Sequence, residues 1–407
     1  MENLKVLHIS YSDTVGGATV AMYRIHHALL DMGVSSEVLV LVNDSGRKEV
    51  IAFKKGIEKF FHKVFLKFGS ILVRLLQKTK FKTTRSLNLF SSGFVNYLNK
   101  SDADIVHIHW VGANAIGIKE LSCLNKSIVW TMHDLWAILG SEHNNVSNDK
   151  RYKYGYLKDN RIRGYSGLDI ERYIWNLKKK FWHNLNLSIV AVSSWQAKVI
   201  KESMLFQFQR VTCINNPIDI DQWFPLEKDY CRSQLGFEKD EIILLYGAFN
   251  FVVDPIKGYE KLVEALNLIS DQRKIVIVYF GSDVEVSFGN FKSINYGKVY
   301  DVDKLRCLYS ASDVFLMPSL QETFGQTALE AICCNLPVVA FSGTGTSDII
   351  IHKKNGYLAK ENEVSDFAAG IQWLLVNKLQ GVRQTTVGKF NSNFIGSQYL
   401  ELYKSII

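Results

Sequence analysis

Two glutamates with seven residues between them carry the strongest chemical signal in this sequence of 407 residues. An apolar strand pattern ends at Met317, Glu322 lies in the following loop, and Glu330 lies about one turn inside a helix that begins around 325–327. The two carboxylates can therefore share one ligand. Carboxylates accept hydrogen bonds from sugar hydroxyls, and a helix N-terminus suits phosphates, so the block favours a sugar nucleotide. An acid on a helix dipole plus a surface glutamate would give the same pattern.

A lysine in the second half of the chain could supply a cation for such phosphates. Lys257 precedes Gly258 and a helical run at 260–269. A compact ammonium group at a helix start suits a bound phosphate. An ordinary solvated lysine is the alternative interpretation.

Two strand ends in the first half also carry candidate binding residues. Gly16 and Gly17 open a helix after the first strand, where a ligand could approach the backbone, although a plain tight turn fits equally well. His133 ends the fourth strand, where it could donate to a substrate hydroxyl, act as an acid or base, or be structural. His107 and His109, on the third strand, are interpreted as structural residues.

The elements that must position these residues alternate between apolar strands and amphipathic helices. Near-continuous apolar runs such as 5–10 and 242–247 indicate strands buried on both faces. We therefore predict an α/β protein with two Rossmann-like, doubly wound domains, 1–214 and 215–390. Such sheets bind ligands at the carboxyl ends of their strands, so we expect the candidate residues to face a cleft between the domains. Segment 391–407 has the spacing of a closing helix.

The composition excludes several classes of protein. Apolar residues make up 47% and charged residues 22%, as in an ordered globular protein. The six cysteines form no Cys-x-x-Cys pair, which favours a reducing compartment and argues against a disulfide framework or a metal site. Neither a secretory signal nor a run long enough to span a membrane is evident, so we expect a cytoplasmic protein.

The net charge of +8 is concentrated in one segment. Between Arg47 and Arg85, twelve Lys or Arg stand against two Glu, a local charge of +10, so the rest of the chain sums to −2. This distribution argues against a nucleic-acid-coating protein. At about 100° per residue, the basic residues of a helix in this segment share one side and its Phe and Leu residues the other. The basic side comprises Lys59, Lys63, Lys67, Arg74 and Lys78.

This basic amphipathic helix could lie on an anionic membrane surface, where each nearby Lys or Arg contributes on the order of 1 kcal/mol. The alternative is a helix that packs its apolar side on the first domain and leaves its basic side in solvent. We favour contact with the inner face of the plasma membrane, because a lipid-linked acceptor would explain the concentration of charge.

These motifs together resemble the family-four glycosyltransferases, which are retaining enzymes with the two-domain GT-B fold. The resemblance covers essentially the whole chain. Its features, in order, are the Gly16-Gly17 loop, His133-Asp134, the Asn216–Asp219 linker, Lys257-Gly258, the block from Pro318 to Ala331, and the turn Asn355–Leu358. In such enzymes the C-terminal helix can cross back onto the first domain.

The resemblance implies transfer of a sugar from a UDP- or GDP-sugar to an acceptor hydroxyl, usually without a metal or other cofactor. Glu322 would hold sugar hydroxyls, Glu330 the ribose, and His133 the donor sugar near its reacting centre. Lys257 would neutralise the diphosphate leaving group. The backbone at Phe324, Gly325, Gln326 and Thr327 would assist Glu322, and the Gly16-Gly17 loop would complete donor binding. The implied acceptor is a lipid-linked saccharide of a surface polysaccharide (O-antigen, capsule or exopolysaccharide).

Two departures from the family pattern leave alternative functions open. The arginine usual beside the first strand of the second domain is missing around Ala248, and no cysteine cluster follows His133-Asp134. The missing arginine favours a catalytically silent subunit that binds sugar nucleotides. A nucleotide-sugar 2-epimerase of the same fold is a further alternative, although the glutamate block argues against it.

Overall fold

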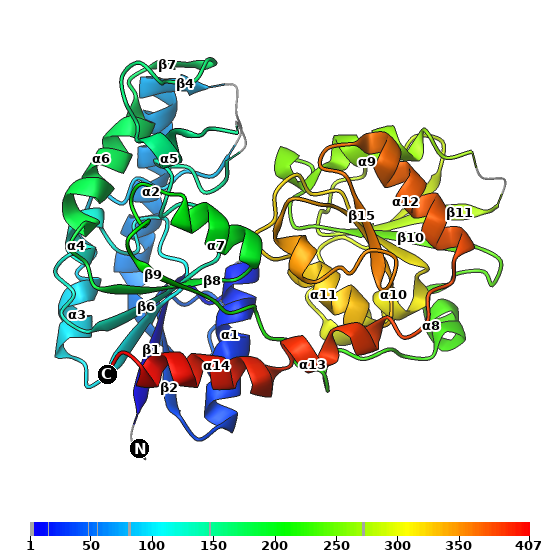
Figure 1. The fold of residues 1–407 in the computed structure, drawn as a ribbon, viewed down its shortest axis with the longest axis horizontal. Coiled ribbons are helices and arrows are strands. Elements are labelled where there is room, and N and C mark those ends of the chain that lie inside the picture. The colour runs from blue at the N-terminus through cyan, green and yellow to red at the C-terminus, as the bar shows by residue number, and fades with distance from the viewer. Residues whose placement is uncertain are drawn as a thin grey trace. The chain divides into compact units, whose positions relative to one another are not determined.

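The computed structural model describes residues 4–14, 16–47, 49–54, 56–79, 83–145, 148–270 and 273–407, apart from the side chains of residues 56, 57, 59, 65, 68 and 72. The chain divides into two compact units, one formed by Met1–Asn215 with Ile395–Ile407 and the other by Asn216–Phe394. Each unit is built around its own parallel sheet (Figure 1).

The first unit contains a seven-stranded parallel sheet in the order β3-β2-β1-β5-β6-β8-β9. The strand order reverses between β1 and β5, which makes their carboxyl ends the topological switch point where doubly wound sheets bind ligands. The central strands are almost fully buried, as their apolar runs predicted. The strands are β1 (Lys5–Ser12), β2 (Ser35–Val42), β3 (Val50–Lys54), β5 (Ile105–Ile108), β6 (Ser127–Met132), β8 (Leu187–Ala191) and β9 (Arg210–Cys213).

Helices cover the first sheet, and a short ribbon extends from it. The ribbon consists of β4 (Gln77–Thr79) and β7 (Tyr165–Gly167), which pair antiparallel. The helices are α1 (Gly16–Asp31), α2 (Gly56–Leu76), α3 (Phe94–Lys100), α4 (Ile118–Leu121), α5 (Arg151–Tyr154), α6 (Ile170–Trp182) and α7 (Ser194–Lys201).

The last helix, α14 (Ser392–Lys404), adds to the core of the first unit from the far end of the sequence. Its Ile395, Tyr399 and Leu402 share a buried cluster with residues of β1 and α1 such as Val6 and Ile25. Gly396 allows the close approach, because a Cβ there would lie 3.2 Å from the Cβ of Ala28. Residues 395–407 therefore complete a unit whose other residues all precede position 216.

The second unit contains a six-stranded parallel sheet in the order β12-β11-β10-β13-β14-β15, with its switch point between β10 and β13. The two sheets confirm the predicted α/β class with doubly wound units. The edge strand β15 corrects one expectation, because residues 356–359 pair with β14 instead of forming a turn. The strands are β10 (Ile242–Gly247), β11 (Ile275–Phe280), β12 (Lys292–Asn295), β13 (Val314–Met317), β14 (Val338–Phe341) and β15 (Gly356–Ala359).

The helices of the second unit begin where the motifs predicted. Helix α11 (Gln326–Cys333) follows the glutamate loop, and the short helix η1 (Pro255–Lys257) leads into α9 (Tyr259–Leu266). The remaining helices are α8 (Lys228–Leu235), α10 (Val302–Ala311), η2 (Gly345–Asp348), α12 (Val364–Val376), η3 (Arg383–Thr385) and α13 (Val387–Phe390).

Helix α2 is the basic amphipathic helix expected from the sequence, and several of its described apolar side chains are exposed. Among its described side chains, Phe60, Phe61 and Leu75 are 63%, 61% and 72% exposed, whereas His62 and Val73 are buried. Among its described side chains, the helix therefore has both buried and exposed apolar residues. No helix within the described ranges is long and apolar enough to cross a bilayer.

Candidate active site

The lysine and the first glutamate predicted from separate motifs form an ion pair in the second unit. Lys257 Nζ lies 2.7 Å from Glu322 Oε1, and the two side chains are 25% and 15% exposed. Burial by itself lowers the pKa of Lys257, but the Glu322 carboxylate outweighs burial and holds the pKa above its ordinary value. Lys257 is therefore a positively charged group at neutral pH, held beside a carboxylate in a partly dry site.

Backbone contacts between two loops hold this pair together. The N–H of Leu320 donates to the carbonyl of Ile256 at 2.8 Å, and the Tyr246 hydroxyl donates to the carbonyl of Lys257 at 3.1 Å. Gly258 has φ +69°, and a Cβ there would lie 1.9 Å from the carbonyl oxygen of Pro318. Only glycine allows both the left-handed backbone and the close approach of the loops.

The loop after Glu322 leads directly into helix α11. Gly325 precedes the helix with φ +105°, and the N–H of Gly345 donates to the carbonyl of Glu322 at 2.8 Å. Phe324 is buried with its ring 5.8 Å from that of Phe390, which anchors the loop. Gln326 forms the first residue of the helix, whose first turn contains no acidic side chain. The positive end of the helix dipole is therefore not neutralised by a carboxylate of that turn.

The second glutamate of the block lies inside α11, as the spacing predicted. Glu330 is buried, and the Tyr309 hydroxyl donates to its Oε2 at 3.3 Å. Thr327 lies in the turn between Gly325 and Glu330. The role of Glu330 toward a ribose stays a prediction.

None of the arginines in the second unit contacts the Lys257–Glu322 pair in the described hydrogen bonds and ion pairs. Their guanidinium groups bind other partners: Arg232 contacts Asp313, Arg273 the carbonyl of Leu375, Arg306 Asp303, and Arg383 the carbonyl of Cys333. The described contacts thus offer no arginine in place of the one missing near Ala248, and Lys257 is the cation of this site.

In the first unit, the structure places His133 at the carboxyl end of β6, one strand from the switch point. Its Nε2 lies 2.9 Å from Nδ1 of His109, and burial lowers the pKa of His133 to about 4 despite the neighbouring Asp134. Asp134 Oδ2 accepts hydrogen bonds from Trp110 Nε1 at 2.8 Å and from His143 Nδ1 at 2.5 Å. His133 is therefore a neutral ring at physiological pH.

The glycine loop begins α1 at the end of β1, beside the same switch point. Gly16 has φ +82°, and no atom lies within 4 Å of the position that its Cβ would occupy, among the described residues. Space therefore remains above Gly16 for a ligand. The contribution of Gly16 and Gly17 to donor binding stays a prediction.

A buried polar network, which no sequence pattern indicated, lies in the loops between Gly140 and Arg172. Glu171 accepts hydrogen bonds from the N–H of Ser141 at 2.6 Å and from Arg85 Nε at 3.2 Å. Glu142 lies 2.9 Å from the same guanidinium group, and burial, together with Glu171, raises the pKa of Glu142 to about 7. These contacts join residues far apart in the chain, so no local signal revealed them.

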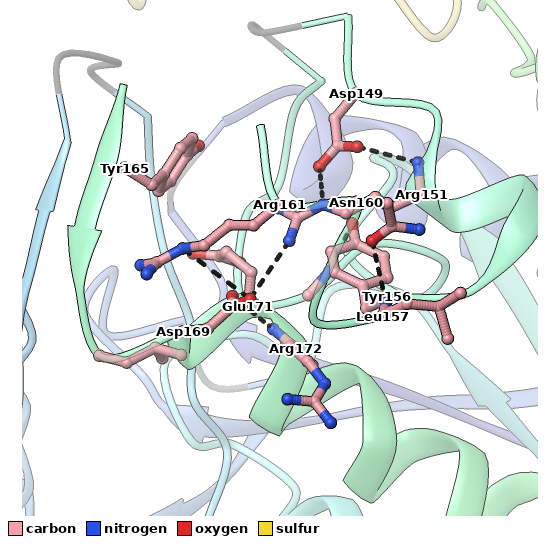
Figure 2. Close-up of polar contacts among 12 residues, drawn as sticks. Asp149, Arg151, Tyr156, Leu157, Asn160, Arg161, Tyr165, Asp169, Glu171 and Arg172 are labelled. Atoms are coloured by element: carbon pink, nitrogen blue, oxygen red, sulfur yellow. Dashed lines mark hydrogen bonds and ion pairs between the residues drawn. The ribbon is translucent and has the colours of Figure 1, made fainter. Parts of the chain in front are cut away.

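Arginine pairs extend this network, and Figure 2 shows how they hold the loop. Arg151 Nε donates to Asp149 Oδ2 at 2.7 Å, and Arg151 Nη1 lies 3.6 Å from Asp169 Oδ2. Arg161 donates to the carbonyl of Gly167 at 2.8 Å. Ion pairs thus hold this loop, without the cysteine cluster that the resemblance led us to expect after His133-Asp134.

Comparison with protein families gives two matches that together cover most of the chain. A model described as "Glycosyltransferase Family 4" matches residues 15–222, and one described as "Glycosyl transferases group 1" matches residues 228–386. The first spans all of the first-unit candidates, and the second contains Lys257, Glu322 and Glu330.

Curated relatives are distant. A D-inositol 3-phosphate glycosyltransferase of Mycobacteroides abscessus is 27% identical over 188 residues, 44% of this chain and 42% of that one. The chain therefore matches less than half the length of that relative. An uncharacterised 41.2 kDa protein in the cps region of Klebsiella pneumoniae is 25% identical over 81% of this chain and 87% of that one. The N,N'-diacetylbacillosaminyl-diphospho-undecaprenol alpha-1,3-N-acetylgalactosaminyltransferase of Campylobacter jejuni is 25% identical over 47% of this chain and 53% of that one.

Solved structures share the fold over nearly the whole chain. Sucrose-phosphate synthase of Thermosynechococcus elongatus has a TM-score of 0.70 at 19% identity and covers 99% of both chains. HepE of Anabaena, in complex with UDP-glucose, has a TM-score of 0.64 at 16% identity, with 99% of this chain and 100% of that one covered. At these identities the similarity establishes the fold.

Proposed function

This chain belongs to the family 4 glycosyltransferases, and we propose that it transfers a sugar, with retention and without a metal, from a UDP- or GDP-sugar to a lipid-linked saccharide. The observation that carries this proposal is the Lys257–Glu322 pair beside the N-terminus of α11. An ammonium group and a helix dipole suit a diphosphate, and a carboxylate suits sugar hydroxyls. HepE, which shares the fold, was solved with UDP-glucose.

In the proposed reaction, negative charge develops on the diphosphate as the bond to the sugar breaks. Lys257 stabilises this charge most in the transition state, together with the N–H groups at the start of α11. Glu322 accepts hydrogen bonds from the donor sugar, and Glu330 holds the ribose. His133 contacts the donor sugar. The charge that a divalent metal would supply at the diphosphate comes from Lys257 and the helix dipole.

Two relatives support the choice of acceptor. The Campylobacter enzyme is named for a diphospho-undecaprenol acceptor, and the Klebsiella protein is named for a cps region. We propose that this chain builds a bacterial surface polysaccharide such as O-antigen, capsule or exopolysaccharide, and works at the inner face of the plasma membrane.

A transfer assay tests the reaction. The protein is incubated with UDP- or GDP-sugars and a membrane extract that contains lipid-linked saccharides, and nucleotide release and product are followed with and without EDTA. We expect acceptor-dependent release that persists in EDTA and gives a product with the donor's anomeric configuration. The variants Glu322→Ala and Lys257→Met should abolish it. Lys261→Met is the matched control, because Lys261 pairs with Glu264 at 3.0 Å on the surface.

Other outcomes of this assay would reject the proposal. Binding without turnover under any pairing would identify a silent subunit. Isomerisation of the sugar without an acceptor would identify an epimerase. Loss of transfer in EDTA, restored by added metal, would reject the metal-independent mechanism.

The membrane surface is the second partner that we propose, and helix α2 is the contact. Phe60, Phe61 and Leu75 are exposed apolar groups, and Lys63, Lys67 and Arg74 are exposed basic groups on the same helix. Exposed Phe and Leu next to basic residues match a helix that lies in the headgroup region of an anionic membrane. Lys78, in β4, adds a further exposed charge, while the side chain of Lys59 lies outside the described residues.

Co-sedimentation with vesicles tests this contact. Charge reversal at Lys63, Lys67 and Arg74, or serine at Phe60, Phe61 and Leu75, should release the protein from phosphatidylglycerol-containing vesicles. Three basic residues at about 1 kcal/mol each correspond to roughly a hundredfold loss of binding. Charge reversal of the exposed Lys353 and Lys354 is the control and should have no effect. Unchanged sedimentation of both α2 variants would reject the contact.

A further inference from the structure

A groove with a volume of about 370 Å³ lies on the first unit, between residues 88–90, helix α4 and helix α6. Pockets of about 300–1,000 Å³ with mostly apolar walls are typical of ligand-binding sites. Every residue that lines this groove belongs to the first unit, so its shape is independent of the second unit. Its apolar walls come from Leu89, Phe90, Ile118, Tyr173, Leu177 and Phe181.

Hydrogen bonds hold the walls of the groove in place. Asn88 Nδ2 donates to the carbonyl of Val111 at 2.6 Å and to that of Ile116 at 2.7 Å. The carbonyl of Asn88 accepts the N–H of Ile118 at 2.7 Å, and Trp182 Nε1 donates to the carbonyl of Ile118 at 2.9 Å. Loop, α4 and α6 are thus joined, and a ligand binds without the cost of ordering them.

The wall that α6 provides is a continuous apolar stripe. Tyr173, Leu177 and Phe181 follow one another at intervals of four residues, so their side chains lie on one face of the helix. Tyr173 is 57% exposed, whereas Leu177 and Phe181 are half-buried and pack on the core of the unit. The stripe is about 12 Å long, at a rise of about 1.5 Å per residue. Its shape suits an elongated hydrocarbon chain.

The edge of the groove is positively charged. Lys119 lines the groove and is exposed, and Lys180 Nζ lies 5.4 Å from the centroid of the Phe181 ring. None of the described residues that line the groove is acidic. Ammonium groups suit phosphate. The groove is therefore complementary to a lipid that has a long apolar chain and a phosphate group.

The groove adjoins the part of the first unit that carries His133. Val111, whose carbonyl accepts the hydrogen bond from Asn88, lines a small pocket together with His133 and His143. Ser86 Oγ, two residues before Asn88, lies 2.8 Å from His143 Nε2. A lipid in the groove is thus a neighbour of a candidate residue. This position favours the lipid-linked acceptor over a phospholipid of the bulk membrane.

We propose that this groove binds the isoprenoid chain of the lipid-linked acceptor, with a phosphate of the acceptor at Lys119 and Lys180. The inference rests on the proposed function for the identity of the lipid. Helix α2 and the groove then have different tasks. The helix contacts the membrane surface as a whole, whereas the groove holds the chain of one acceptor molecule.

Isothermal titration calorimetry of the full chain with soluble isoprenoid diphosphates tests the groove without any need for sugar transfer. UDP is present throughout, so that it occupies the proposed nucleotide site. Farnesyl diphosphate should bind at least about tenfold more tightly than isopentenyl diphosphate, which is the effect of two buried methylene groups. Equal Kd values would overturn the proposal, because the affinity would come from the diphosphate alone. Equally tight binding of dihexanoylphosphatidylglycerol would identify a phospholipid site and would also overturn it.

Substitutions at the exposed edge of the groove test its residues. Tyr173→Asp replaces an apolar wall by a carboxylate and should weaken the binding of farnesyl diphosphate about tenfold or more. Lys119→Glu reverses one charge and should weaken it about three- to tenfold. Tyr154→Asp and Lys158→Glu are the matched controls, because both residues are exposed on the same unit and neither lines the groove. An unchanged Kd in both groove variants would overturn the proposal.

Photo-crosslinking locates the bound chain. A farnesyl diphosphate analogue that carries a benzophenone should label residues within 88–90, 118–119 or 173–181, and labelling confined to α2 would overturn the proposal. In the transfer assay, Tyr173→Asp should raise the KM for an acceptor with an isoprenoid chain, with little change for the same saccharide diphosphate on a short alkyl group. An equal rise in both KM values would overturn the groove as the site of the chain. Absence of transfer by every variant, while farnesyl diphosphate still labels the groove, would reject only the proposed function.

Discussion

Removal of the negative charge of Glu322 should tighten the binding of a nucleoside diphosphate while it abolishes sugar transfer. In the free protein the ammonium group of Lys257 is held at 2.7 Å by the carboxylate of Glu322. A diphosphate that binds Lys257 must compete with this carboxylate and is also repelled by it. Glu322→Gln keeps the shape of the side chain and an acceptor oxygen but removes both effects.

The geometry of the pair sets the size of the effect. At 2.7 Å and an effective dielectric constant of about 20, the gross attraction is about 6 kcal/mol. Most of this is offset, because the side chains are 25% and 15% exposed and their hydration changes when the pair separates. We expect a net gain of about 1–2 kcal/mol, which is about a five- to thirtyfold lower Kd for UDP or GDP.

Isothermal titration calorimetry of the full chain with UDP and with GDP measures this change. The gain should shrink at high salt, because the phosphates remain partly solvated. Glu264→Gln removes the carboxylate of a surface Lys–Glu pair in the same unit and should leave the Kd unchanged. Weaker or equal binding by a folded Glu322→Gln variant would refute the reasoning that Lys257 and Glu322 form one site for diphosphate and sugar.

Two further predictions concern stability. Gly258→Ala should lower the melting temperature of the second unit far more than Gly381→Ala, although both glycines have a similar positive φ. A Cβ at Gly258 would lie 1.9 Å from a backbone oxygen, whereas a Cβ at Gly381 would lie 3.5 Å from a side-chain oxygen. Equal shifts in calorimetry would contradict this argument. The first unit should also lose stability as the pH falls from 6.5 to 4, because burial lowers the pKa of His26 and of His133 to about 4 and their neutral forms are favoured only in the folded state. His26 contributes up to roughly 3 kcal/mol to the free energy of unfolding above pH 6.5. The one histidine of the second unit, His352, is exposed, so we expect no such contribution there. If lowering the pH reduced the melting temperatures of both units equally, buried histidines of the first unit would not be the cause.

Local sequence patterns predicted the elements that place the candidate residues. Apolar runs identified the central strands, and the helix after Glu322 begins at Gln326, within the predicted range. These features are encoded locally, since hydrophobic periodicity and glycine positions act within a few residues. The edge strands β3 and β15 were missed, because residues 50–54 lie in the basic segment and residues 355–358 were interpreted as a turn.

The sequence by itself determined the fold class, the strand ends that carry chemistry and the amphipathic nature of α2. Only the tertiary structure decided which of these residues meet. Lys257 and Glu322 are 65 residues apart and pair because β10 lies beside β13. The rings of His8, His109 and His133 lie next to one another because β1, β5 and β6 are adjacent in the sheet, which the order of the strands in the sequence does not specify. Helix α2 leaves Phe60 and Phe61 exposed for the same reason: periodicity shows that a helix has an apolar side, but the surrounding packing decides which of its residues are covered.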